Sequence, residues 1–124
     1  MTARVVLVGI LMATATLPLG AGEPITMRVS PAVAFAPANL VVRATIESDA
    51  QNRAVVVTAD SADFYRSSEL PLDGDQAPRT NTFEFRSLPP GNYEVRATLV
   101  GASGRPRGVV RQSVNVMTSG GGDR

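Results

Sequence analysis

Two runs of alternating apolar and polar residues, joined by a Pro-Pro-Gly turn, constrain the fold of this chain more than any other feature. The runs cover residues 80–87 and 92–100, and the turn is Pro89-Pro90-Gly91. Alternation with a period of two places successive side chains on opposite faces of a strand, so each run can bury one face and expose the other. The pattern predicts two strands of a β-sandwich that are joined at a corner. We expect Tyr93 to point inward and to fix this corner with its hydroxyl, next to Gly91.

The first 22 residues have the order of an export signal. Arg4 precedes an apolar stretch that begins at Val5, and small residues end the segment at residues 20–22. We therefore expect a signal peptide helix over residues 1–22, cleavage before Glu23, and a secreted or periplasmic protein. The stretch is interrupted by Pro18 and is shorter than the roughly 20 residues of a membrane span. A retained anchor is the alternative, and no membrane span is expected once the signal is removed.

Composition excludes several classes of function. The chain has 12 Lys and Arg residues, all of them Arg, against 11 Asp and Glu residues. Cleavage removes only Arg4, so the mature net charge is near zero, which disfavours nucleic acid as a partner. The chain contains neither Cys nor His. Disulfides, thiol nucleophiles, Ser-His pairs and zinc sites built on these ligands are therefore excluded.

The remaining pattern predicts an all-β domain over residues 23–117. Short alternating or β-branched segments are separated by turn residues, and no helical period occurs after the signal. The expected strands cover residues 25–30, 39–47, 53–59, 64–71, 80–87, 92–100 and 109–117. The proline-containing segment 31–37 is expected to be extended but unpaired, with Phe35 turned toward the core. Residues 118–124 have nothing to bury and are expected to form a flexible tail.

Two segments resemble a known family. Residues 37–46 (PANLVVRATI) and 88–95 (LPPGNYEV) are similar to strands of bacterial immunoglobulin-like and fibronectin type III-like domains. The resemblance implies a seven-stranded antiparallel immunoglobulin-like sandwich and a use in extracellular binding or spacing. The chain departs from antibody domains because it lacks the Cys pair and Trp of their core.

In the immunoglobulin order, three loops would meet at one end of the domain. These loops, around residues 48–53, 73–79 and 101–108, would gather seven charged side chains, including Arg53 and Arg79, and five of the seven are candidates that are either ordinary solvated loop residues or ligand-binding groups. The five are Asp49, Asp73, Asp75, Arg105 and Arg107. Asp73-Gly74-Asp75 is a weak match to a calcium site, because such a site needs 6 to 8 oxygen ligands. We expect no metal and no cofactor.

These observations predict that the chain is an exported, non-catalytic interaction or accessory module. Its expected partner is an unknown protein or cell-envelope polymer. The alternative is a small-ligand or carbohydrate-binding module that uses the three loops, and the third possibility is a carboxylate hydrolase. We expect no enzyme, because the strand acids lie next to arginines in a pattern typical of exposed charge ladders. Phe64-Tyr65 has two interpretations. Either Phe64 fills the core while Tyr65 stays exposed, or the pair forms an aromatic platform for a sugar or a peptide.

Overall fold

The computed structural model describes residues 23–119. The expected signal peptide, residues 1–22, lies outside the described residues, as do residues 120–124 of the expected tail. Thr118 and Ser119 follow the last strand without regular structure. Within residues 23–119, no helix has the length and apolar character needed to cross a bilayer.

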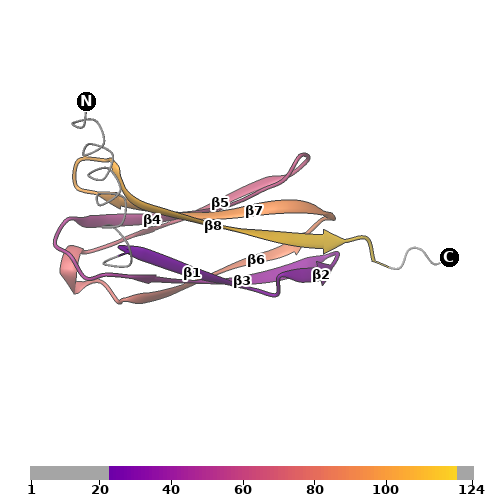
Figure 1. Ribbon diagram of the computed structural model, residues 1–124, viewed down its shortest axis with the longest axis horizontal. Helices are drawn as coiled ribbons and strands as arrows, with labels where there is room; N and C mark the ends of the chain where they lie inside the picture. The colour runs from indigo at the N-terminus through magenta and orange to yellow at the C-terminus, as the bar shows by residue number, and fades with distance from the viewer. Residues whose placement is uncertain (1–22, 120–124) are drawn as a thin grey trace, which may run out of the picture.

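Residues 23–119 form eight strands and one short 3-10 helix, arranged in two layers (Figure 1). One layer is a three-stranded sheet in the order β1-β3-β6, and the other is a five-stranded sheet in the order β2-β8-β7-β4-β5. The elements are β1 (Ile25–Ser30), β2 (Val33–Phe35), β3 (Ala38–Ile46), β4 (Asn52–Asp60), β5 (Tyr65–Pro71), η1 (Gly74–Gln76), β6 (Thr80–Leu88), β7 (Gly91–Gly101) and β8 (Pro106–Met117).

The core lies between the two sheets and follows the period-two pattern. In β3 and β7 every second residue is buried, so each strand presents one apolar face to the opposite sheet. Strand β6 contributes its two phenylalanines. The largest fully buried side chains include Ile25, Leu40, Ile46, Phe85, Leu88 and Leu99. The all-β prediction is confirmed.

The strand count and the purely antiparallel arrangement predicted from the sequence are wrong. The segment expected to be unpaired contains β2, which pairs with β8 in parallel, so the five-stranded sheet is mixed. Phe35 is 63% exposed instead of buried. The reason is the alternation within β2: Ala34 packs against the core, so Phe35, one residue later, faces outward.

Side chains link the two sheets along both flanks. On one flank the amide of Gln112 accepts a hydrogen bond from the Val29 N–H (3.3 Å) and donates one to the Val29 carbonyl (3.2 Å). On the other flank Arg66 donates to the carbonyl of Arg86 (2.7 Å). These contacts leave the two ends and the outward sheet faces as the accessible surfaces of the domain.

The connections fall at opposite ends of the sandwich. The β3–β4, β5–β6 and β7–β8 loops lie at one end, with η1, which is the left end in Figure 1. The β6–β7 turn and the C-terminal end of β8 lie at the other end. We call the first of these the loop end and the second the corner end.

Candidate functional site

The three loops of the loop end pack against one another. The Ser48 hydroxyl donates to the backbone carbonyl of Asp75 (3.3 Å), which joins the β3–β4 loop to η1. Gly74 has a positive φ of 52°, and a Cβ there would lie 3.1 Å from the carbonyl oxygen of Ala50. A residue without a side chain therefore suits both the backbone and the close approach of the two loops.

Arg107 joins the third loop to this cluster through a pair of contacts. One guanidinium nitrogen donates to the Asp49 carboxylate (3.0 Å), and another donates to the side-chain carbonyl of Asn52. Asn52 is fully buried, and its own amide nitrogen donates to the carbonyl of Glu47 (2.9 Å). The stem of Arg107 passes over Gly101, where a Cβ would come within 2.9 Å of it. We call Asp49, Asn52 and Arg107 the loop latch.

The other predicted loop residues are placed differently. Arg105, Asp73 and Asp75 are exposed, and none of them takes part in an ion pair within residues 23–119. Asp73 and Asp75 line a small hollow of about 370 Å³ together with Arg53. No group of three or more side chains that could hold a metal ion occurs in the described part of the chain. The structure thus brings Asp49 and Arg107 into contact and leaves the other three exposed to solvent.

At the corner end, Tyr93 is buried behind the β6–β7 turn. Its hydroxyl donates to the carbonyl of Pro89 (2.7 Å), and its ring meets Phe64 edge to face, with centroids 6.3 Å apart. Burial raises the pKa of the Tyr93 hydroxyl above its ordinary value, although Ser61 and Arg66 act in the opposite direction. Gly91 lets the β4–β5 turn approach, because a Cβ there would lie 3.3 Å from Ser61.

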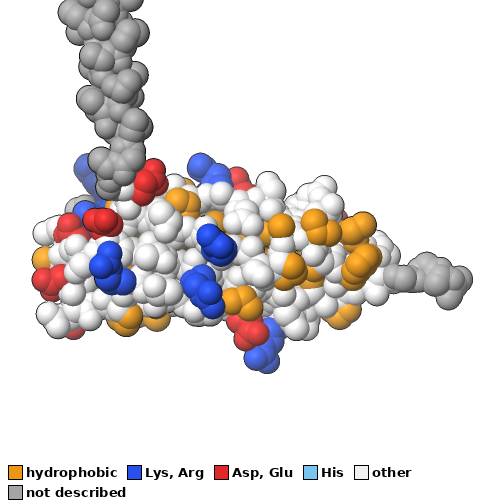
Figure 2. All heavy atoms as spheres, turned by 60° about the horizontal axis from the view of Figure 1, so that its bottom comes forward, with side chains coloured by type: hydrophobic (Ala, Val, Ile, Leu, Met, Phe, Trp, Pro, Cys, Tyr) orange, Lys and Arg blue, Asp and Glu red, His pale blue; other side chains and the backbone are white. Residues whose placement is uncertain are grey.

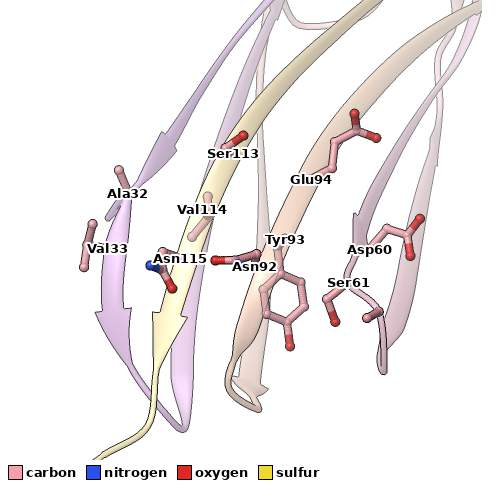
Figure 3. Close-up of a pocket in the computed structure, with 11 residues that line it drawn as sticks. Ala32, Val33, Asp60, Ser61, Asn92, Tyr93, Glu94, Ser113, Val114 and Asn115 are labelled. Atoms are coloured by element: carbon pink, nitrogen blue, oxygen red, sulfur yellow. The ribbon is translucent and has the colours of Figure 1, made fainter.

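A second surface, which the sequence patterns did not single out, lies near the corner end on the outward face of the five-stranded sheet. It is a shallow hollow of about 740 Å³ (Figure 3). Its floor is formed by β7 and β8, one wall by Ala32 and Val33, and the other wall by residues 60–62. We call it the sheet-face hollow.

Six of the eleven residues that line this hollow have Asp, Glu, Asn or Ser side chains. They are Asp60, Ser61, Asn92, Glu94, Ser113 and Asn115. Strand register explains why they share one face, since Glu94 lies opposite both Asp60 and Ser113, and Asn92 lies opposite Asn115. Figure 3 shows the Asn92 and Asn115 side chains next to each other above the floor. The alternation of β7 and β8 in the sequence indicates that these positions face outward, and this is the signal by which a polar sheet face could be predicted.

The charges at this hollow are unequally paired. Glu94 contacts both Arg96 (2.8 Å) and Arg111 (3.4 Å), so its charge is neutralised by its neighbours. The hollow's other carboxylate, Asp60, has no ion pair or side-chain hydrogen bond within residues 23–119. The same part of the chain provides no hydrogen-bond partner for the side chains of Asn92, Ser113 and Asn115, which are all exposed.

Exposed aromatic residues flank the hollow at both edges of the sheet. Tyr65 on β5 lies opposite Asp60 and is 61% exposed. On the other edge, Phe35 lies opposite Met117 on β8, and Val33 lies opposite Asn115. Figure 2 shows a cluster of apolar side chains, in orange, at the corner end of the domain. Phe64 is partly buried against the core, so only Tyr65 of the Phe64-Tyr65 pair is an exposed platform.

Comparisons with known proteins describe the fold and no more. No protein-family model matches the sequence, and no curated protein matches it. Among solved structures, a superoxide reductase (neelaredoxin) from Ignicoccus hospitalis superposes with a TM-score of 0.60 at 11% identity, over 74% of this chain and 79% of that one. A single-residue variant of that reductase superposes with a TM-score of 0.62 at 10% identity, over 82% of this chain and 86% of that one.

A third similar structure is a family 76 glycoside hydrolase from a bovine Bacteroides thetaiotaomicron strain. It superposes with a TM-score of 0.55 at 15% identity, over 77% of this chain and 21% of that chain. At identities this low the likeness concerns fold alone. The likeness extends to the superposed part of each structure, which for the hydrolase is 21% of its chain.

Proposed function

We propose that this chain is an exported, non-catalytic binding module with an immunoglobulin-like strand order, and that it binds its ligand at the sheet-face hollow. One observation carries the proposal. Asp60, Asn92, Ser113 and Asn115 surround one hollow, are exposed, and have no side-chain partner within residues 23–119. Polar groups that converge on a concave surface are the usual means by which a site orients a ligand.

The strand order supports the immunoglobulin-like part of the proposal. The sheet β1-β3-β6 faces the strands β8-β7-β4-β5, which corresponds to strands A, B and E facing G, F, C and C′. The hydroxyl of Tyr93 bonds back to the backbone at the turn before β7, as in the tyrosine corner of such domains. The short β2 is an addition to this scheme.

Side-chain chemistry supports the non-catalytic part. The chain has no His and no Cys to act as general base, nucleophile or soft metal ligand. Asp60 and Glu94 lie opposite each other, as the two acids of a glycosidase would. However, Asp60 is exposed and Glu94 is paired with two arginines, whereas a general acid of that kind needs an apolar environment.

Export is proposed from the N-terminal pattern of a basic residue, an apolar stretch and a small-residue exit. The neutral mature charge fits a module that meets its partner through short-range contacts instead of long-range attraction. N-terminal sequencing of the protein recovered from the culture medium or periplasm tests this part. A mature chain beginning within a few residues of Glu23 supports it, and a chain found only in the cytoplasm with Met1 retained contradicts it.

The binding proposal is tested by capture from the native cell envelope. The full chain is immobilised and incubated with solubilised envelope, and the retained protein and carbohydrate are both quantified. The double variant Asn92→Arg with Asn115→Arg fills the hollow with bulky charge and should abolish retention. Arg105→Ala with Arg107→Ala changes the loop end and should leave retention unchanged. If the loop-end variant loses the captured material and the hollow variant keeps it, the loops form the binding site and this proposal is wrong.

A further inference from the structure

The sheet-face hollow and its flanking aromatic residues form one continuous strip across the five-stranded sheet. Register places Tyr65 beside Asp60, Asp60 beside Glu94, and Glu94 beside Ser113. On the far side Asn115 neighbours Val33 of β2, and Phe35 follows two residues later on the same face. Neighbouring strands lie about 4.8 Å apart, so the five strands span about 19 Å. A ligand that touches both edges is therefore elongated.

The strip presents hydrogen-bonding groups suited to hydroxyls. Each asparagine offers both a donor and an acceptor, Ser113 offers both, and Asp60 offers acceptors only. These short side chains stand on neighbouring strands, about 4.8 Å apart, so several of them can reach hydroxyls of one sugar. The hydroxyl-bearing face of a sugar can therefore exchange donors and acceptors with them without any charge on the ligand.

The electrostatics of the strip favour a neutral ligand. Arg96 and Arg111 lie on the same sheet face and both contact Glu94, so their two positive charges are matched by the two carboxylates of this face, Glu94 and Asp60. Asp60, which has no ion pair among the described residues, would repel a negatively charged polymer. An acidic polysaccharide is therefore disfavoured on this face.

The backbone of the strip favours a sugar over an extended peptide. A peptide commonly binds a sheet by adding a strand at an open edge, where backbone groups are unpaired. The hollow lies instead over β4, β7 and β8, and β7 lies between the other two strands. From Glu94 onward β7 is paired with both neighbours, so its backbone groups are already used by the sheet. A ligand at the hollow therefore forms its hydrogen bonds mainly with side chains, namely the two amides, the hydroxyl and the carboxylate described above.

We propose that the strip binds a neutral oligosaccharide that lies across the strands, with one sugar ring stacked on Tyr65 and the chain running over Asp60, Asn92 and Asn115 toward Phe35. This inference rests on the proposed function and names its ligand class. The exposed ring of Tyr65 supplies the apolar face against which a pyranose packs. The convergent polar groups fix the orientation of the sugar.

The test is titration of the full chain with defined sugars, followed by calorimetry and by amide chemical shifts. The neutral probes are the hexaoses of β-1,4-glucose, β-1,3-glucose, β-1,4-xylose and β-1,4-N-acetylglucosamine, and the anionic probe is the hexamer of galacturonic acid. We expect at least one neutral probe to bind, to shift the amides of β7 and β8, and to be insensitive to added salt. The galacturonic acid hexamer should not bind.

Variants assign the contacts. The double variant Asn92→Ala with Asn115→Ala should lower the affinity for the neutral probe at least tenfold, and Tyr65→Ala should lower it to a similar degree. Tyr65→Phe keeps the ring and should retain most of the affinity. Arg43→Gln, on the outward face of the other sheet, is the matched control and should have no effect. The inference is overturned if no neutral probe binds at millimolar concentration, if only the anionic probe binds, or if binding survives the asparagine double variant.

Failure of this inference is distinguishable from failure of the proposed function. If the envelope capture depends on the hollow but retains a protein and no carbohydrate, the hollow remains a binding site and the sugar assignment is wrong. If capture does not depend on the hollow at all, the proposed function is wrong as well.

Discussion

The loop end and the sheet-face hollow contain the same kinds of side chain but use them in opposite ways. At the loop end, Arg107 binds both Asp49 and Asn52 and holds the β7–β8 loop against the β3–β4 loop. At the hollow, Asp60, Asn92 and Asn115 have no such partners within residues 23–119. The comparison shows that residue type and a loop position do not reveal whether a side chain is already bound by its neighbours. What matters is whether the fold already provides the side chain with a partner.

The largest expected effect concerns the floor of the hollow, which belongs to the core. Tyr93→Ala removes a buried ring and should lower the free energy of unfolding by about 3–5 kcal/mol. Tyr93→Phe removes only the hydrogen bond to Pro89 and should cost about 0.5–1.5 kcal/mol. Urea denaturation measures both. Equal stability of the two variants would show that the ring contributes nothing and that the floor is not part of the core.

The next effect tests the buried member of the loop latch. Asn52→Ala leaves the carbonyl of Glu47 and one guanidinium nitrogen of Arg107 without their partner, and should cost about 1–3 kcal/mol. Urea denaturation of this variant is compared with that of Asn92→Ala, which removes the same group from an exposed position. If the two variants are equally stable, Asn52 is not a structural residue.

The ion pair of the latch should contribute less, because both side chains are partly exposed. Asp49→Ala should cost about 0.5–1 kcal/mol. Arg107→Ala should cost about 1–3 kcal/mol, because it also leaves the buried side-chain carbonyl of Asn52 without its donor. A double-mutant cycle should show that the two losses are not additive. Raising the salt concentration should reduce the coupling. Fully additive losses would mean that the two residues stabilise the loops independently and that the latch is not a unit.

Alkaline pH provides a further test of the buried tyrosine. Burial raises the pKa of Tyr93 in the folded state above the value of about 10 expected in the unfolded chain. The folded state therefore holds this proton to higher pH, and stability from this group is present below pH 10 and is lost as pH rises through the folded-state value. Unfolding free energies measured on both sides of pH 10 should fall more steeply for the parent than for Tyr93→Phe. Identical slopes would contradict the assignment.

The smallest expected effect is on the stability of the hollow variants. Asn92→Ala and Asn115→Ala remove exposed side chains without partners in the described structure, so each should change the unfolding free energy by less than about 0.5 kcal/mol. Thermal and urea unfolding give this value. A loss as large as that of Asn52→Ala would mean that these amides support the sheet.

Much of the fold follows from local patterns in the sequence. Alternation in residues 92–100 predicts that Tyr93, Val95, Ala97 and Leu99 are buried, and all four are. The same reasoning fails for β2. A strand of three residues is too short to show a period in the sequence, and its partner β8 lies near the other end of the chain, so no local pattern reveals the pairing. Phe35 was therefore expected in the core on hydrophobicity alone, whereas its position on the strand faces it outward.

The candidate site was less accessible to sequence reasoning than the fold. The loops were predicted as a binding site because they are rich in Asp, Gly and Arg. However, turns favour Asp and Gly for backbone reasons alone. The hollow depends on the register of neighbouring strands, which brings Asp60, Asn92 and Asn115 together from distant parts of the chain. Single-strand patterns show that these residues face outward. They do not show which neighbours they meet.

The most direct test of this contrast measures stability and ligand retention on two double variants of the full chain. Asn92→Ala with Asn115→Ala should unfold at the parent's urea concentration and lose the captured ligand. Asp49→Ala with Arg107→Ala should unfold at a lower urea concentration and keep the ligand. The reverse outcome, with the latch variant losing the ligand at parental stability and the hollow variant retaining it, would contradict the claim that the loop end is structural and the sheet-face hollow binds.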